Sequence, residues 1–233
     1  MAGSPAQPLF FYPPIKKGIQ MSDPLKTLQQ QIREQQAQNP HIAAQIASSA
    51  ILQRLFEFMS DDKGVHVESV FAALGTLAGH ACQQIALDRG LTQVSDNAGN
   101  RYYYGEALNR VLLEGKLSVW SLVGGAVQSH GGKLPDIREI VAHTTESIGT
   151  EQFGQPRLPE GHPIRCEPKQ CLVLWQPLKQ EILDVLPVPK SDWALAYALA
   201  IQDLIDQAAG IIPPELAARI VMECAVPMSK LAV

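Results

Sequence analysis

The pattern of hydrophobic and polar positions is most regular between residues 67 and 87, VESVFAALGTLAGHACQQIAL. Bulky or apolar side chains recur there at the spacing that places them on one side of a helix. Their positions are Val67, Val70, Phe71, Leu74, Leu77, Ala78, Ala81 and Ile85. Only a narrow polar strip interrupts them, at Thr76, His80, Gln83 and Gln84. The pattern therefore predicts a helix at the centre of the core.

A second face of this segment has almost no side-chain volume, and its members are Ala72, Gly75, Gly79, Cys82 and Ala86. A glycine in a helix interior costs about 1 kcal/mol relative to alanine. Two glycines four residues apart therefore predict close packing against another backbone. We expect Gly124 and Gly125, in a second predicted helix, to contribute to that contact.

Apolar periodicity, capping residues and prolines predict further helices along the chain. They are expected at residues 24–39, 40–60, 105–114, 118–130, 135–148, 177–186, 192–209 and 213–225. We expect Pro227 to end the last of them, because proline removes a backbone donor. Residues 171–175, CLVLW, fit either a buried strand or the start of a helix.

Residues 91–104 have a different texture, with two short β-favouring runs around the turn-forming cluster SDNAGN. This pattern predicts a β-hairpin in which Tyr102 and Tyr104 share one face. The predicted fold is thus mainly α, a multi-helix orthogonal or bundle-like domain of about eight helices with one small hairpin at about 91–104.

The domain organisation follows from where proline and glycine gather. Residues 1–21 are rich in proline and predict an extended arm, and residues 22–233 predict a single globular helical domain. Alternatively, Met21 is the true start and the preceding residues are a mis-assigned leader. The Gly/Pro-rich stretch at 149–170 is too long for a simple connector, which makes it the candidate internal boundary or a functional loop.

Composition limits the class of protein. The chain has 233 residues and a net charge of −4, and its basic residues are scattered, so we expect no nucleic-acid partner. Four dispersed cysteines predict reduced thiols and a cytoplasmic location. No signal peptide is visible, and we expect no segment to cross a membrane, because no apolar run approaches about 20 residues. The sequence does not identify a cofactor.

Two sets of polar and aromatic residues are candidates for a ligand pocket. His80, Thr76 and Gln84 lie one turn apart on the predicted core helix, and Tyr102, Tyr104 and Trp120 could supply aromatic walls. The alternative is that His80 is a hydrogen-bonded core histidine and that the aromatic residues are simply core.

Two other sets have the residue types of a metal site. Glu139, His143 and Glu146 follow the i, i+4, i+7 spacing of one helix face, and a solvated acidic face is the alternative explanation. His162, Cys166 and Cys171 lie close together in the Pro-rich stretch, but the paired CxxC spacing of a zinc site is missing, and two unrelated thiols explain them as well.

Surplus apolar surface is the third signal. The arm carries Phe10, Phe11 and Tyr12, and the helix from Asp192 is apolar on two sides, at Trp193, Leu195 and Leu199. Either a partner subunit covers these residues or the helix is enclosed by its own chain. The sequence therefore favours a non-enzymatic, self-associating interaction module, a homo-oligomer. The alternatives are a binder of a small apolar or amphipathic molecule between helices, and a metal-dependent enzyme.

Overall fold

The computed structural model describes residues 23–232. Its α-helices are α1 (Asp23–Gln35), α2 (Ile42–Met59), α3 (Val67–Leu87), α4 (Glu106–Asn109), α5 (Val119–Ser129), α6 (Ile137–Glu146), α7 (Pro168–Cys171), α8 (Trp175–Leu178), α9 (Trp193–Ala208) and α10 (Pro214–Lys230). Short π- and 3₁₀-helical turns are η1 (Arg110–Glu114), η2 (Leu172–Leu174), η3 (Lys179–Leu183) and η4 (Lys190–Asp192). The strands are β1 (Ser60–Asp61), β2 (Gly64–Val65), β3 (Thr92–Ser95) and β4 (Arg101–Tyr104).

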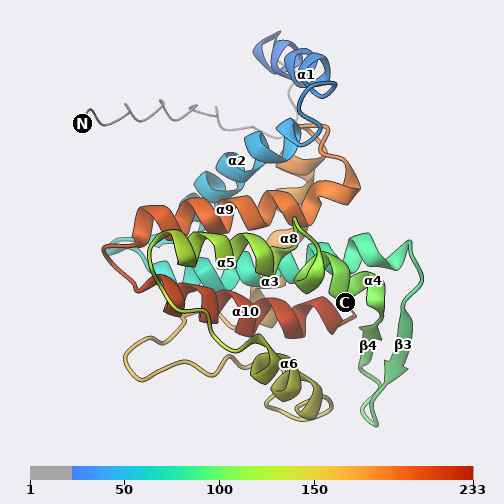
Figure 1. Ribbon diagram of the computed structural model, residues 1–233, viewed down its shortest axis with the longest axis vertical. Helices are drawn as coiled ribbons and strands as arrows, with labels where there is room; N and C mark the ends of the chain where they lie inside the picture. The colour runs from blue at the N-terminus through green and yellow to red at the C-terminus, as the bar shows by residue number, and fades with distance from the viewer. Residues whose placement is uncertain (1–22, 233) are drawn as a thin grey trace.

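The prediction of a mainly α fold with a small hairpin is confirmed. Helices α9 and α10 run one above the other in Figure 1, with α5 in front of them and α3 behind. Helix α2 runs obliquely above α9 in this view and packs against it, and α1 stands at the top. The predicted arm, residues 1–21, lies outside the described residues, and the domain boundaries stay predictions.

Helix α3 is the centre of the core, as its sequence predicted. Every residue from Ser69 to Gln83 is buried. A Cβ added to Gly75 would lie 2.9 Å from the Cα of Val221, and one added to Gly79 would lie 2.9 Å from the Cα of Ala225. These distances leave no room for a side chain, so the two glycines let the backbone of α10 approach.

The prediction that Gly124 and Gly125 pack against this glycine face was wrong. The face meets α10, whereas Gly124 on α5 lies against the side chain of Leu134. A Cβ on Gly125 would meet no atom of the described residues within 4 Å. Helix α5 packs against α9 and α10, whereas the glycine face of α3 packs against α10.

The length and hydropathy of α3 also correct an expectation. The sequence predicts that no segment is apolar enough to cross a membrane. Within residues 23–232, however, α3 is the one helix that is long and apolar enough to do so. The rest of the chain buries 89% of this span. Core helices of globular proteins pass the same test, so its length and composition are weak evidence for a membrane helix.

Both hairpins are short. In the predicted one, Thr92 pairs with Tyr104 and Val94 with Tyr102, and the Tyr102 ring is buried. The sequence did not predict the pairing of β1 with β2, because residues 61–64 read only as the end of a helix. Gly64 supplies the positive φ (+100°) that this tight turn requires.

The helical alternative holds for residues 171–175, which continue α7 through η2 into α8. The prediction for the end of the last helix was wrong. Helix α10 does not stop before Pro227 but runs through it to Lys230. The Gln83 side chain donates to the carbonyls of Ser229 (3.0 Å) and Leu231 (2.8 Å), which stabilises the extra turn.

Candidate functional site: the groove of residues 151–169

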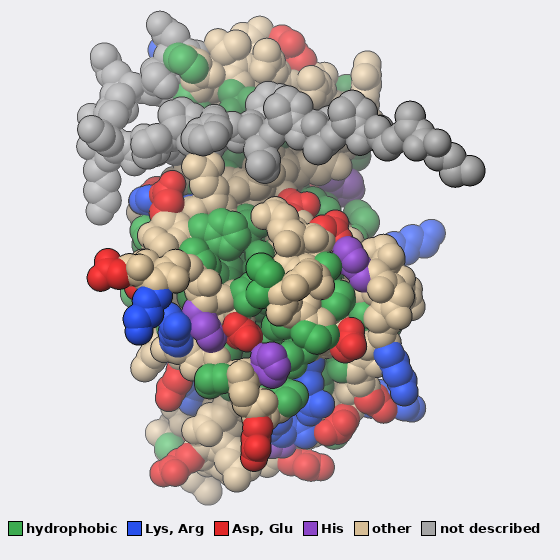
Figure 2. All heavy atoms as spheres, turned by 90° about the vertical axis from the view of Figure 1, so that its left-hand side faces the viewer, with side chains coloured by type: hydrophobic (Ala, Val, Ile, Leu, Met, Phe, Trp, Pro, Cys, Tyr) green, Lys and Arg blue, Asp and Glu red, His purple; other side chains and the backbone are tan. Residues whose placement is uncertain are grey.

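The segment between α6 and α7 folds into a groove of about 640 Å³. Its apolar floor and walls come from Phe153, Leu158, Ile164 and prolines 156, 159, 163 and 168. Its polar lining comes from Glu151, Gln155, Glu160, His162, Glu167 and Lys169. In Figure 1 the loop after α6 extends toward the left, and Figure 2 shows that side of the molecule, where hydrophobic, histidine, acidic and basic side chains lie close together.

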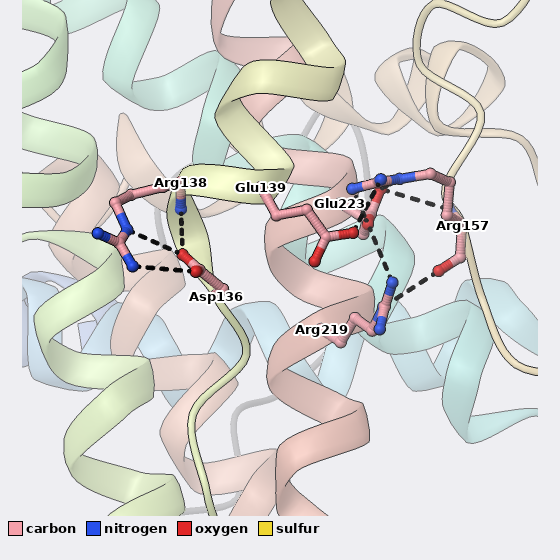
Figure 3. A network of polar contacts seen from close by, with 6 residues as sticks. All are labelled: Asp136, Arg138, Glu139, Arg157, Arg219 and Glu223. Carbon is pink, nitrogen blue, oxygen red and sulfur yellow. Dashed lines mark hydrogen bonds and ion pairs between the residues drawn. The ribbon is translucent and has the colours of Figure 1, made fainter.

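An ion-pair network fixes one end of the segment to α10 (Figure 3). Arg157 Nη2 lies 2.9 Å from Glu223 Oε1, and the backbone N–H of Arg157 donates to the other carboxylate oxygen at 3.3 Å. The Glu223 side chain is only 2% exposed, so its charge depends on these donors. Arg219 joins through Nε, which donates to the Arg157 carbonyl at 3.2 Å, and Arg157 Nη1 reaches Glu139 of α6 at 3.1 Å.

A small apolar cluster fixes the segment a second time. The buried rings of Phe153 and Tyr102 meet edge to face with 5.0 Å between their centroids, and Met228 completes the cluster. Gly154 has φ +81°, and a Cβ there would lie 2.9 Å from Met228 Cε. The ammonium of Lys169 lies 5.7 Å from the Phe153 ring centroid. The floor of the groove is therefore part of the packed structure.

The opposite wall holds a histidine on a carboxylate. His162 Nδ1 lies 3.1 Å from Oε1 of Glu68, which lies in the first turn of α3. Burial opposes ionisation of Glu68, but hydrogen bonds from His162 and from the backbone outweigh it and lower the pKa of Glu68. A negative charge there is also favoured by the helix dipole. The pair is therefore an ionised carboxylate that accepts from an imidazole N–H.

The contact occupies Nδ1 of His162, a residue that also lines the groove. On the far side of Glu68, His66 Nε2 lies 3.5 Å from Oε2, and His66 Nδ1 lies 2.9 Å from Ser69 Oγ.

The two predicted metal sites receive no support from the structure. Glu139 and Glu146 are exposed, and Glu139 pairs with Arg157, a contact that a metal ion would have to replace. His143 is half-buried on the same helix. His162 turns to Glu68, away from the contact between Cys166 and Cys171. Throughout residues 23–232, no three His, Cys, Asp or Glu side chains are grouped to hold a metal ion.

The predicted ligand residues are divided among separate places. His80 is buried against the ring of Trp175, with 4.8 Å between centroids, and burial lowers its pKa to about 4. Within the described part of the chain, His80 Nδ1, Thr76 Oγ1 and Tyr197 Oη are buried without a hydrogen-bond partner. The alternative, that His80 is a hydrogen-bonded core residue, stays a prediction. Gln84, on the next turn, is half-buried.

The aromatic members of that prediction lie elsewhere. Tyr102 belongs to the cluster below the groove, and its hydroxyl donates to Asp96 at 3.0 Å. The ring of Tyr104 lies 4.6 Å from the Lys230 ammonium. Trp120 is half-buried on α5 against the main core. These contacts separate the aromatic residues from the Thr76 and His80 pair.

The predicted interface on α9 is mostly enclosed by the chain itself. Helices α2, α3 and α5 pack around α9, and Leu195 is buried among them. Trp193 is half-buried, and its Nε1 donates to the Val188 carbonyl at 3.2 Å. Leu199 is also half-buried. Surplus apolar surface therefore no longer supports self-association on this helix; Phe10, Phe11 and Tyr12 lie outside the described residues, and the homo-oligomer stays a prediction.

Sequence reasoning missed the two polar pairs that shape the groove. Arg157 and Glu223 are 66 residues apart, and Glu68 and His162 are 94 apart. No local spacing links such partners. The unusual length and Pro/Gly content of residues 149–170 did mark the segment as a possible functional loop. Comparison with protein families, with curated proteins and with solved structures finds no match to this chain.

Proposed function

We propose that this protein binds a small amphipathic cation in the groove of residues 151–169. The observation that carries the proposal is a cavity of about 640 Å³ with an apolar floor and a rim dominated by acceptors and negative charge. Pockets for small molecules typically measure roughly 300–1,000 Å³. The proposal keeps the ligand-binding alternative of the sequence reading and moves it from the helical core to this segment.

The charges around the groove favour a positively charged head group. Glu151, Glu160 and Glu167 line it, and within the described lining Lys169 is the single Lys or Arg residue. That lysine already lies over the Phe153 ring. An ammonium group therefore finds partners where a carboxylate would meet repulsion.

The floor favours an apolar body. Phe153 is buried, Leu158 and Ile164 are half-buried, and four prolines line the walls. Prolines restrict the backbone before binding, which lowers the entropy lost when a ligand orders the loop. The Arg157–Glu223 pair and the Phe153 cluster hold the segment from below. A short alkyl or aryl chain with a terminal amine fits this combination.

The test is an NMR titration of the isotope-labelled full chain with octylammonium chloride and, separately, with sodium octanoate. The two probes have the same chain length and opposite charge. We expect saturable shifts of the backbone amides of residues 151–169 with octylammonium. We also expect octanoate to bind at least about tenfold more weakly, a difference of about 1.4 kcal/mol.

Two variants make the test specific. The double variant Glu151→Gln/Glu160→Gln should weaken octylammonium binding several-fold, because it removes rim charge without touching the floor. The matched control is Glu106→Gln, which removes an exposed carboxylate that pairs with Arg110 on another part of the surface. Equal affinity for both probes, or shifts scattered over exposed apolar residues such as Val173 and Ile211, would overturn the proposal.

A further inference from the structure

The segment that forms the groove also contains a pair of thiols. The Sγ atoms of Cys166 and Cys171 lie 2.8 Å apart, and neither cysteine is in a disulfide. Cys166 lies in the chain between Ile164 and Glu167, which both line the groove, and Cys171 is the last residue of α7. The pair thus joins the wall of the groove to the helix that follows it.

The two thiols differ in exposure in the way that stepwise oxidation requires. Cys166 is half-buried and within reach of a small oxidant, whereas Cys171 is fully buried directly behind it. A disulfide has an S–S length of about 2.05 Å, so the two sulfurs need only a short approach. Susceptible cysteines are typically accessible and next to a second thiol that resolves the first product.

We propose that Cys166 and Cys171 form a reversible intramolecular disulfide when the protein meets hydrogen peroxide. This proposal is independent of the ligand proposed for the groove. It rests on the contact between the two sulfurs and on their unequal exposure.

The steps balance with peroxide as the oxidant. Cys166 Sγ attacks one peroxide oxygen, the O–O bond breaks, and the departing hydroxide takes the thiol proton as water. The product is a sulfenic acid on Cys166. Cys171 Sγ then attacks that sulfur, the S–O bond breaks, and the hydroxide leaves with the Cys171 proton as a second water. The two thiols lose two electrons in total, and peroxide is reduced to two waters.

The remaining cysteines serve as internal references. Burial raises the pKa of the Cys82 and Cys224 thiols, and both side chains are fully enclosed. Burial, together with the hydrogen bond to Cys166, also raises the pKa of Cys171. Cys166 is the accessible thiol of the pair, so the attack on peroxide begins there, and Cys171 gives up its proton only as the S–O bond breaks.

The test uses the full chain, treated with a few equivalents of hydrogen peroxide, blocked with N-ethylmaleimide and digested with trypsin. Cleavage after Arg165, Lys169 and Lys179 places the two cysteines on separate peptides, residues 166–169 and 170–179. We expect these peptides to be joined, with a mass two hydrogens below their sum, and to separate with dithiothreitol. The thiols of Cys166 and Cys171 should disappear at least tenfold faster than those of Cys82 and Cys224.

Two variants separate the roles of the sulfurs. Cys171→Ser should leave the sulfenic acid of Cys166 unresolved, so that dimedone labels Cys166 in the variant and not in the unmodified chain. Cys166→Ser, at the half-buried position, should keep Cys171 reduced at the same peroxide dose. Equal oxidation rates for all four thiols would overturn the proposal. So would sulfinic acid on Cys166 with Cys171 still free, or joined peptides that form only in denatured protein.

Discussion

Helix α10 meets two of its neighbours by opposite means. Toward α3 it presents Val221 and Ala225, whose backbone packs on Gly75 and Gly79 without an intervening side chain. Toward the 149–170 segment it presents Arg219 and Glu223, which are bound by charge and hydrogen bonds to Arg157. Arg219 and Glu223 each lie two positions before Val221 and Ala225 in the chain, an offset of about 200° around a helix. One helix therefore carries an apolar seam on one side and a polar clamp on the other.

The comparison separates what makes the fold from what shapes the groove. The α3–α10 seam is apolar, buried and tolerant of no added volume, so it contributes to the stability of the whole core. The clamp holds a loop in place with a buried carboxylate whose partners are partly exposed. Changes in the seam should lower global stability, and changes in the clamp should mainly release the segment that lines the groove.

The largest expected effect comes from Gly79→Ala. The new Cβ would collide with the backbone of α10 at Ala225, which no side-chain rotation relieves. Overpacking typically costs about 1–3 kcal/mol, and a collision with backbone places this substitution near about 3 kcal/mol. Urea unfolding followed by circular dichroism should show this loss in the free energy of unfolding, with α3 and α10 both exchanging faster in hydrogen exchange.

The matched control for this prediction is Gly125→Ala on α5. Gly125 is exposed, and a Cβ there meets no described atom within 4 Å. Alanine should therefore stabilise the helix by about 0.5–1 kcal/mol. Equal effects of the two substitutions would show that the seam is not the tight contact described above.

A titratable group beside the seam gives the second prediction. Burial lowers the pKa of His80 to about 4 from its ordinary value of 6.5. Between these pH values the unfolded chain binds a proton that the folded chain does not, so stability is complete above pH 6.5 and falls as the pH drops toward 4. The gap corresponds to roughly 3 kcal/mol.

The measurement compares urea unfolding at pH 7 and pH 4.5 for the unmodified chain and for His80→Gln. The variant has no titrating group at this position. Its free energy of unfolding should therefore fall less between pH 7 and pH 4.5 than that of the unmodified chain, by an amount approaching roughly 3 kcal/mol. His143→Gln, which removes a half-buried histidine on α6, should retain the full pH dependence. If His80→Gln kept the pH dependence of the unmodified chain, a group other than His80 would be responsible for the loss of stability at low pH.

The seam and the clamp also differ in how much the sequence revealed. The apolar spacing of residues 67–87 predicted the central helix, and the spacing of Gly75 and Gly79 predicted its tight packing; both patterns are local. They could not identify α10 as the partner, because that choice depends on how the whole chain folds. The prediction of where α10 ends was wrong for a related reason. The local rule for Pro227 was overridden by distant contacts, those of Met228 with the Phe153 cluster and of Gln83 with the last carbonyls.

The candidate site was predictable only as a segment. Length and Pro/Gly content marked residues 149–170, and the reading of the histidine and cysteines there as metal ligands used residue type alone. Their orientation comes from partners far away in the chain, since His162 is turned by Glu68 across 94 residues. The Cys166–Cys171 contact is the exception, because only five residues separate the thiols. The five-residue spacing of Cys166 and Cys171 allows such a contact, but it does not show that the two side chains point toward each other.

The third prediction tests the clamp through Glu223→Gln. The substitution removes a buried charge and leaves Arg157 and Arg219, each about a third exposed, without their shared partner. Removing one member of a fully buried pair costs more, so partial exposure of the arginines reduces the expected loss to about 2 kcal/mol. Hydrogen exchange should accelerate in residues 151–169 while α3 stays protected. Equal acceleration in α3 would remove the distinction between seam and clamp.

The smallest effect is expected at the other carboxylate that Arg157 contacts. Glu139 binds the same guanidinium at 3.1 Å, but its side chain is 60% exposed, against 2% for Glu223. Water screens an exposed pair of this kind, so Glu139→Gln should change stability by less than about 0.5 kcal/mol. Because the two variants share one arginine and one type of substitution, their ratio measures how much burial strengthens the clamp. A loss as large as that of Glu223→Gln would mean that the network is held by the number of its contacts and not by the enclosure of one charge.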